Sequence, residues 1–323
     1  MVNGYAFPGI SDIALLGALQ YLTYLSVFSA KTRIDGTITE LNDTALIRKC
    51  YVNGVAPVLT LTNQRESGGF SGDIAHAVIA DEEVKTKLIQ NVMEYLDRRN
   101  YFGLNIDFEY VREEDRTLYT QFLLDFAAAL RRVGYSFSVA IAPKISQEQS
   151  GLLYTAHDYG AVGSIADKVI IMTYEWGYTY GEPMAVAPID KVRQVLDYAV
   201  MEMPPEKILM GMANYGYSWT LPYKKGTAAR PLSLSEIPQT AYSQYADIRF
   251  DDTAQSPFFR YYDSAGTEHI AWFEDTRSIE AKLKLVSEYG LGGVSYWNIN
   301  TLYRPNWAVL SGMYGIEKVF GQG

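Results

Sequence analysis

The sequence contains few cysteine and histidine residues, which limits the covalent and metal chemistry available to it. Its 323 residues include one cysteine, Cys50, so no disulfide can form within the chain and no cysteine cluster can bind a metal. Cys50 belongs to an amphipathic stretch, where we expect a small buried apolar residue. The three histidines show neither an HExxH motif nor paired spacing, so we expect no metal site.

Long apolar runs and dense positive charge are also absent. No run reaches the roughly 18 apolar residues of a membrane helix, and the opening "MVNGYAFPGISD" has no basic segment followed by an apolar one. We therefore expect no membrane insertion and no signal peptide in this sequence. A net charge of −9 and a pI of about 5 oppose binding to nucleic acid. The glycine-rich "SGGFSGD" at 67–73 lacks a P-loop lysine, which favours a rim loop beside a substrate cleft.

Short β-branched or aromatic runs are present and alternate with amphipathic stretches such as 81–100 and 112–134. This alternation predicts parallel strands joined by right-handed crossovers. The count of eight favours closure into an α/β fold, the (β/α)8 or TIM barrel. The eight predicted strands are 2–7, 22–29, 56–62, 103–109, 136–143, 168–174, 207–215 and 292–299.

One interval interrupts this rhythm after the seventh predicted strand. Residues 219–274 include two aromatic, strand-like runs separated by the turn signal "DSAG". They predict a small α+β insertion on the top of the barrel. We therefore expect a catalytic barrel made of residues 1–218 and 275–323, with its seventh helix at about 275–290.

The fourth predicted strand carries polar and apolar residues in alternation. Residues two apart share one face of a strand, so Asn105, Asp107 and Glu109 point one way. The other face consists of Leu104, Ile106 and Phe108 and is expected to pack under the helices. The polar set then points into the barrel, with Glu109 at the rim where such barrels have their active sites.

Two neighbouring carboxyl groups in such a place predict acid catalysis. Burial and a like charge nearby raise a carboxyl pKa, so either Asp107 or Glu109 should hold a proton near neutral pH. A protonated Glu109 would serve as a general acid. Side by side on one strand, the two groups cannot straddle a sugar ring as acid and nucleophile. A 2-acetamido group of the substrate can supply the nucleophile, with Asp107 orienting that amide.

Four strand ends resemble one enzyme family. "FGLNIDFE" resembles the DGxDxDxE signature of glycoside hydrolase family 18, the chitinases and endo-N-acetylglucosaminidases. "MTYE" (172–175), "GMANYGYSW" (211–219) and "GGVSYWNI" (292–299) resemble its motifs on strands six, seven and eight, in the same order. The segments "NIDFE", "MTYEWG" and "HIAWFED" are most similar to bacterial spore-associated hydrolases, usually carried behind LysM modules, that cut N-acetylglucosaminyl bonds of cortex peptidoglycan.

The resemblance implies a role for each matching residue. Glu109 would act as general acid and then base, and Asp107 would orient the acetamido group. Tyr174 would donate its hydroxyl to the acetamido oxygen, and Trp297 would form the apolar floor under the cleaved sugar. The other residues implied to bind substrate are Met172, Glu175, Tyr215, Asn105, Tyr5 and Phe28.

Three positions depart from the family pattern. Phe102, Asn105 and Glu175 stand where the family has aspartates. Asn105 cannot take up a proton or a charge, so Asp107 lacks one route for its proton. We therefore expect a pH optimum different from that of ordinary chitinases. The longer Glu175 would narrow the subsite or reach a different substrate atom.

Together these features predict a retaining, substrate-assisted glycosidase that hydrolyses β-1,4 bonds of N-acetylglucosamine-containing glycans, with spore cortex peptidoglycan preferred. We expect a polysaccharide as its partner, no cofactor, a monomer, and an extracellular, cell-wall or spore location. Three alternatives stay open: a chitinase-like lectin without turnover, an enzyme acting on chitin or N-glycans, and a barrel aldolase or isomerase using Lys144 as a Schiff base.

Overall fold

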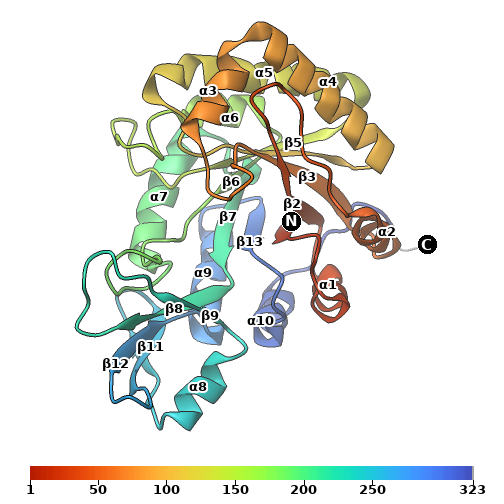
Figure 1. The fold of residues 1–323 in the computed structure, drawn as a ribbon. Coiled ribbons are helices and arrows are strands. Elements are labelled where there is room, and N and C mark those ends of the chain that lie inside the picture. The colour runs from red at the N-terminus through yellow and green to blue at the C-terminus, as the bar shows by residue number, and fades with distance from the viewer. Residues whose placement is uncertain (322–323) are drawn as a thin grey trace.

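The barrel is closed and consists of eight parallel strands. The computed structural model describes residues 1–321. Around the barrel the strands follow the order β1, β13, β7, β6, β5, β4, β3, β2 (Figure 1). The TIM-barrel prediction is therefore confirmed, with β13 as its eighth strand. The strands are β1 (Val2–Ala6), β2 (Tyr24–Lys31), β3 (Ala56–Thr62), β4 (Gly103–Asp107), β5 (Ser136–Ile141), β6 (Lys168–Ile171), β7 (Ile208–Ala213) and β13 (Gly293–Trp297).

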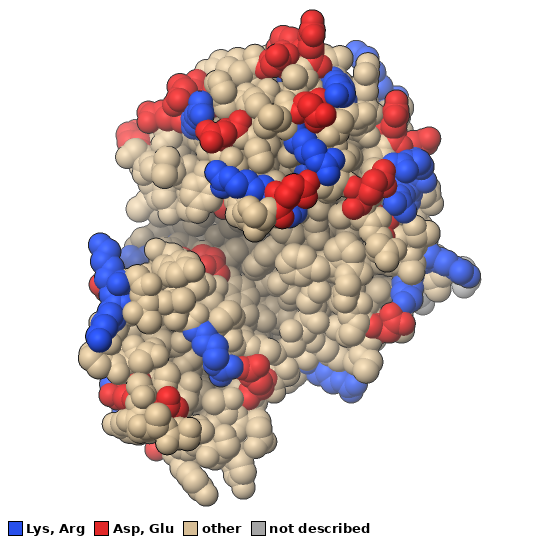
Figure 2. Space-filling view, viewed as in Figure 1, with Lys and Arg blue, Asp and Glu red and all other residues tan. Residues whose placement is uncertain are grey.

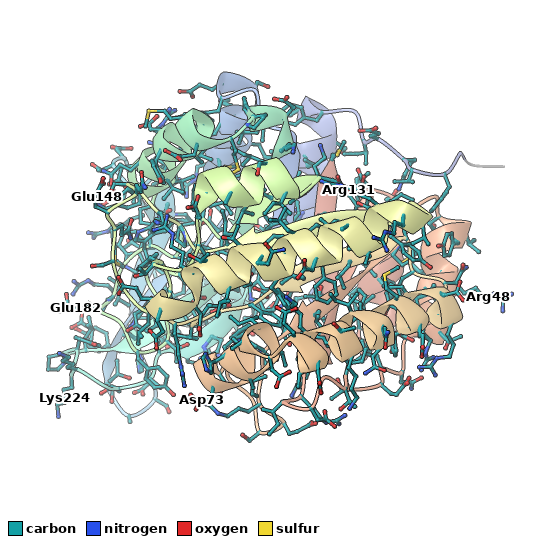
Figure 3. All side chains as sticks on the ribbon, turned by 90° about the horizontal axis from the view of Figure 1, so that it is seen from above. Arg48, Asp73, Arg131, Glu148, Glu182 and Lys224 are labelled. Atoms are coloured by element: carbon teal, nitrogen blue, oxygen red, sulfur yellow. The ribbon has the colours of Figure 1, made fainter. Side chains whose placement is uncertain are left out.

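Helices surround the barrel and connect its strands. Figure 3 shows two long helices, α4 and α5, side by side on the outside, and they are in contact. The helices are α1 (Asp12–Leu19), α2 (Thr44–Val52), α3 (Gly72–Ala80), α4 (Glu82–Arg99), α5 (Arg116–Val133), α6 (Tyr159–Ile165), α7 (Ile189–Glu202), α9 (Thr276–Glu288) and α10 (Arg304–Met313), with the 3-10 turns η1 (Glu113–Asp115) and η2 (Pro205–Lys207).

The two long helices end where their sequences indicate, and α4 also begins there, whereas α5 begins at Arg116, four residues later than predicted. Asp81 accepts hydrogen bonds from two amides in the first turn of α4, and Asn100 ends that helix with a φ of 60°. Gly134 ends α5 with a φ of 80°, in the left-handed region that glycine adopts without strain. The acidic first turn and basic last turn of α4 complement its dipole.

The insertion forms a separate five-stranded antiparallel sheet to one side of the barrel, seen at the lower left of Figure 1. The "DSAG" turn joins β11 and β12, as the sequence indicates. The predicted boundary between residues 218 and 219 falls inside β8, which pairs with β9 and β12. The elements of the insertion are β8 (Tyr215–Thr220), β9 (Arg230–Ser233), α8 (Ile237–Ser243), β10 (Arg249–Asp251), β11 (Ser256–Tyr262) and β12 (Glu268–Trp272).

The apolar face of β4 packs under the helices as predicted. Leu104, Ile106 and Phe108 are fully buried, and the Phe108 ring lies 5.3 Å from that of Phe122 on α5. Cys50 is fully buried as well. Within residues 1–321, no helix combines the length and apolar character needed to cross a bilayer.

Candidate active site

The polar residues of β4 lie at three different depths. Asn105 is fully buried and lies deepest, while Asp107 is 5% exposed at the strand end. Glu109 was expected within the strand, but β4 ends at Asp107 and Glu109 lies two residues beyond it, half-buried. Beyond the strand end, the backbone of Glu109 is hydrogen-bonded to the side chain of Asn63 and not to a neighbouring strand.

Asp107 is a buried carboxyl group with little hydrogen bonding. One of its oxygens, Oδ1, has no partner among the described residues. Burial removes the carboxylate from water and raises the pKa of Asp107 to about 7. The group therefore sits near half-protonation at neutral pH, in a place where a substrate amide could become its partner.

Asn63 holds the backbone of Glu109 on both sides. Its Oδ1 accepts from the Glu109 amide at 3.0 Å, and its Nδ2 donates to the Glu109 carbonyl at 2.7 Å. Burial raises the pKa of the Glu109 carboxyl well above its ordinary value, and the charges of Asp107 and Glu175 raise it further. The raised pKa favours the protonated form of Glu109, which is the form that can donate a proton.

Above these carboxyl groups lies a cavity of about 320 Å³. Figure 2 shows the hollow between the barrel and the insertion, with charged side chains gathered mainly on the outer surfaces. Eight of the ten predicted site residues line the cavity: Tyr5, Phe28, Asp107, Glu109, Met172, Tyr174, Glu175 and Trp297.

Aromatic rings make up one wall of the cavity. Trp297, at the end of β13, meets Phe28 edge to face at 4.7 Å and Tyr5 at 5.4 Å. Tyr174 lines the same cavity, and burial together with the nearby carboxyl groups raises the pKa of its hydroxyl well above 10. Tyr174 therefore keeps its proton and can act as a hydrogen-bond donor.

Glu175 lies at the mouth of the cavity in an unusual backbone conformation. Its φ is +67°, in the left-handed region that glutamate seldom adopts. Its Oε1 accepts hydrogen bonds from the hydroxyls of Tyr215 and Tyr217. Loss of water around the carboxyl group raises the pKa of Glu175, although the two tyrosine hydroxyls act in the opposite direction.

Two predicted binding residues lie outside the main cavity. Asn105 lies beneath it, where it accepts from the Tyr5 hydroxyl at 2.9 Å and donates to Ser138 at 3.0 Å. Its polar atoms are thus engaged inside the barrel and do not face a substrate. Tyr215 lines an adjoining pocket of about 290 Å³, which shares Glu175 and Trp297 with the main cavity.

Sequence reasoning missed several lining residues because they lie on connecting loops. Leu153 and Tyr154 come from the loop after β5, and Trp176 from the loop after β6. Trp176 could have been found, since it follows the strand-six motif directly. Asn63 could also have been found, because it follows β3 at the edge where all parallel strands end. The rim loop predicted at 67–73 does border the cavity through Phe70.

Lys144 is buried away from the cavity. Its ammonium group donates to the carbonyls of Gln147 and His157 at 3.4 and 3.3 Å, and it does not line the main cavity. This position removes the structural basis for a Schiff-base enzyme. In residues 1–321, no three or more histidine, cysteine, aspartate or glutamate side chains are grouped so that they could hold a metal.

The family model of the glycosyl hydrolases family 18 matches residues 18–301. A cortical fragment-lytic enzyme of Bacillus subtilis is 42% identical over 302 residues, which is 93% of this chain and 70% of that protein. The crystal structure of the Bacillus cereus spore cortex-lytic enzyme SleL has a TM-score of 0.94 and 38% identity, over 99% of this chain and 75% of that one. A Chromobacterium violaceum chitinase has a TM-score of 0.90 and 26% identity, over 96% and 98% of the two chains. The chain belongs to the glycosyl hydrolases family 18.

Proposed function

We propose that this glycoside hydrolase cleaves β-1,4 bonds next to N-acetylglucosamine in spore cortex peptidoglycan, with retention of configuration. The observation that carries the proposal is the pair of carboxyl groups in one cavity: Glu109, whose pKa is raised by burial, beside the buried Asp107, whose Oδ1 has no partner among the described residues. The similarity to cortical fragment-lytic enzymes supports this substrate, because the shared segment covers most of the chain. Such a substrate would place the enzyme outside the cell, at the cell wall or in the spore.

In the first step Glu109 donates its proton to the glycosidic oxygen as that bond breaks. The carbonyl oxygen of the substrate's acetamido group attacks the anomeric carbon from the opposite face and forms an oxazolinium ion. Asp107 accepts the acetamido N–H and stabilises the positive charge. Tyr174 donates its hydroxyl to the acetamido oxygen, and Trp297 supports the apolar face of the sugar.

In the second step Glu109, now ionised, removes a proton from water as the water attacks the anomeric carbon. The oxazolinium ring opens, and the configuration is retained after two inversions. Met172, Tyr5 and Phe28 would shape the subsite, and Glu175 and Tyr215 would contact the substrate where the two pockets meet. The raised pKa of Glu109 serves the first step, and its charge is needed in the second.

Mass spectrometry of glycan digests tests this proposal. Purified cortex and vegetative peptidoglycan are treated with the wild-type chain and with Glu109→Gln. We expect new products ending in reducing N-acetylglucosamine, or the free sugar, from cortex material with the wild type alone. Chitin and N-glycans are digested in parallel. If the enzyme cuts either of these and cuts neither peptidoglycan, the substrate assignment is wrong. If the glycan is bound and left intact, the chain is a lectin of this family.

A further inference from the structure

His157 lies just before α6 and is only 1% exposed. Its Nδ1 accepts a hydrogen bond from the Ala142 amide at 3.0 Å, and its Nε2 lies 3.1 Å from the Phe108 carbonyl. An amide N–H can only donate and a carbonyl can only accept, so Nδ1 must be unprotonated and Nε2 must carry the proton. His157 is therefore held as one neutral tautomer.

These two bonds join two parts of the active site. Phe108 directly precedes Glu109, and Ala142 follows β5 and lines the cavity. Between Ala142 and His157 runs the loop 143–156, which brings Leu153 and Tyr154 to the cavity wall. The imidazole thus links the two ends of this loop, and it also binds the loop to Phe108, the residue before Glu109.

We propose that His157 is a positioning residue, which as its neutral tautomer with the proton on Nε2 holds Glu109 and the 143–156 loop in place. The proposal rests on the proposed role of Glu109 as the acid. Protonation would put an N–H on Nδ1, facing the Ala142 amide donor, and would break that bond. The base of the 143–156 loop would then no longer be joined through His157 to Phe108, the residue before Glu109.

The surroundings of the imidazole oppose its protonation. Lys144 lies against the His157 carbonyl from the β5 side, and the Tyr119 ring lies 5.9 Å away on α5. The adjacent Asp158 pairs with Arg116 at 2.7 Å. Neither ring nitrogen contacts a carboxylate in residues 1–321, and burial lowers the pKa of His157 to about 4. An imidazolium ion would thus be unpaired at this position.

Two substitutions separate the two bonds. His157→Asn keeps an acceptor where Nδ1 lies and loses the donor to Phe108, whereas His157→Gln keeps a donor near the Phe108 carbonyl and loses the acceptor for Ala142. The matched control is His269→Gln in β12 of the insertion. The assay measures kcat and KM on cortex glycan from pH 3.5 to 8, for variants with wild-type circular dichroism.

We expect His157→Asn to lower kcat on the order of tenfold with KM near that of the wild type, because Glu109 loses its support. His157→Gln should mainly raise KM, because the cavity wall is released. The control should match the wild type in both kcat and KM. If kcat and KM of both variants stay within twofold of the wild type, His157 is structural only and the proposal is overturned.

Nitrogen-15 NMR of the wild-type histidines gives an independent test that applies even if the variants do not fold. We expect His157 to stay neutral with its proton on Nε2 from pH 8 down to pH 5. Titration near 6.5, or a proton on Nδ1, would overturn the proposal. Because NMR needs no substrate, a wild-type chain that cuts no glycan would refute the proposed function without affecting this result.

Discussion

Replacing Asp107 with asparagine should stabilise the protein while reducing its activity, and the stabilisation should grow with pH. The Asp107 carboxyl is 5% exposed, and one oxygen lacks a partner. Burial raises its pKa from 3.8 to about 7. Each pKa unit corresponds to about 1.4 kcal/mol, so an ionised Asp107 costs the folded state about 4 kcal/mol at a pH well above 7.

The sign follows from the raised pKa. The folded protein binds the Asp107 proton more tightly than the unfolded chain does, so the stability from this group is complete below pH 3.8 and is lost as the pH rises through 7. Asparagine has a similar shape and cannot ionise. The difference in unfolding free energy between Asp107→Asn and wild type should therefore increase by about 2 to 3 kcal/mol from pH 5 to pH 8.

Urea denaturation at pH 5, 6, 7 and 8 measures this difference, with Asp247→Asn as the control because Asp247 is exposed in the insertion. The control should differ from the wild type by less than about 0.5 kcal/mol at every pH. A constant difference between Asp107→Asn and wild type across this range would refute the claim that Asp107 is an ionisable group held at a cost. Full glycosidase activity in Asp107→Asn would contradict the proposed catalytic role of Asp107.

Three further predictions concern other parts of the structure. Glu109→Gln should lower kcat by a factor of about 10² to 10⁴ with little effect on KM, measured on cortex glycan; a loss below tenfold would exclude Glu109 as the acid. Trp297→Ala should raise KM about tenfold, because the sugar loses its aromatic floor. The control Tyr245→Ala should leave KM unchanged, because Tyr245 is 96% exposed and does not line the cavity. Lys282→Met should lower the free energy of unfolding, measured in urea, by about 3 to 5 kcal/mol, because it leaves Glu274 buried without its partner at 2.8 Å. Adding Glu274→Gln should restore most of this loss. An unchanged urea midpoint for Lys282→Met would contradict a structural role for the pair.

Much of the fold could be predicted from the sequence because the strands of a closed barrel are short, apolar and evenly separated by amphipathic helices. The alternation along 103–109 correctly separated Phe108, which is buried under α5, from Asp107, which faces the barrel interior. The insertion boundary was less accurate. The predicted barrel segment ran to residue 218, yet residues 215–220 form β8 in the second sheet, and only pairing partners distant in sequence reveal this.

The candidate site was partly predictable for a similar reason. Side chains at strand ends, such as Tyr174 and Trp297, meet at one edge of any parallel barrel. Contacts through loops could not be predicted, because their geometry is set by tertiary packing. The two hydrogen bonds from Asn63 to the Glu109 backbone, and the bonds of His157 to two strand ends, are of this kind. The same limit applies to Asn105, whose engagement by Tyr5 and Ser138 is visible only in the folded chain.

The central claim is that the substrate's own acetamido group is the nucleophile, with Glu109 as acid and Asp107 as its support. The most direct test measures kcat/KM on aryl β-glycosides of N-acetylglucosamine whose acetyl group carries zero, one, two or three fluorine atoms. Fluorine withdraws electrons from the attacking carbonyl oxygen, so we predict that kcat/KM falls steeply with each fluorine added. A flat series would contradict the account, because the nucleophile would then have to be a group of the protein or water.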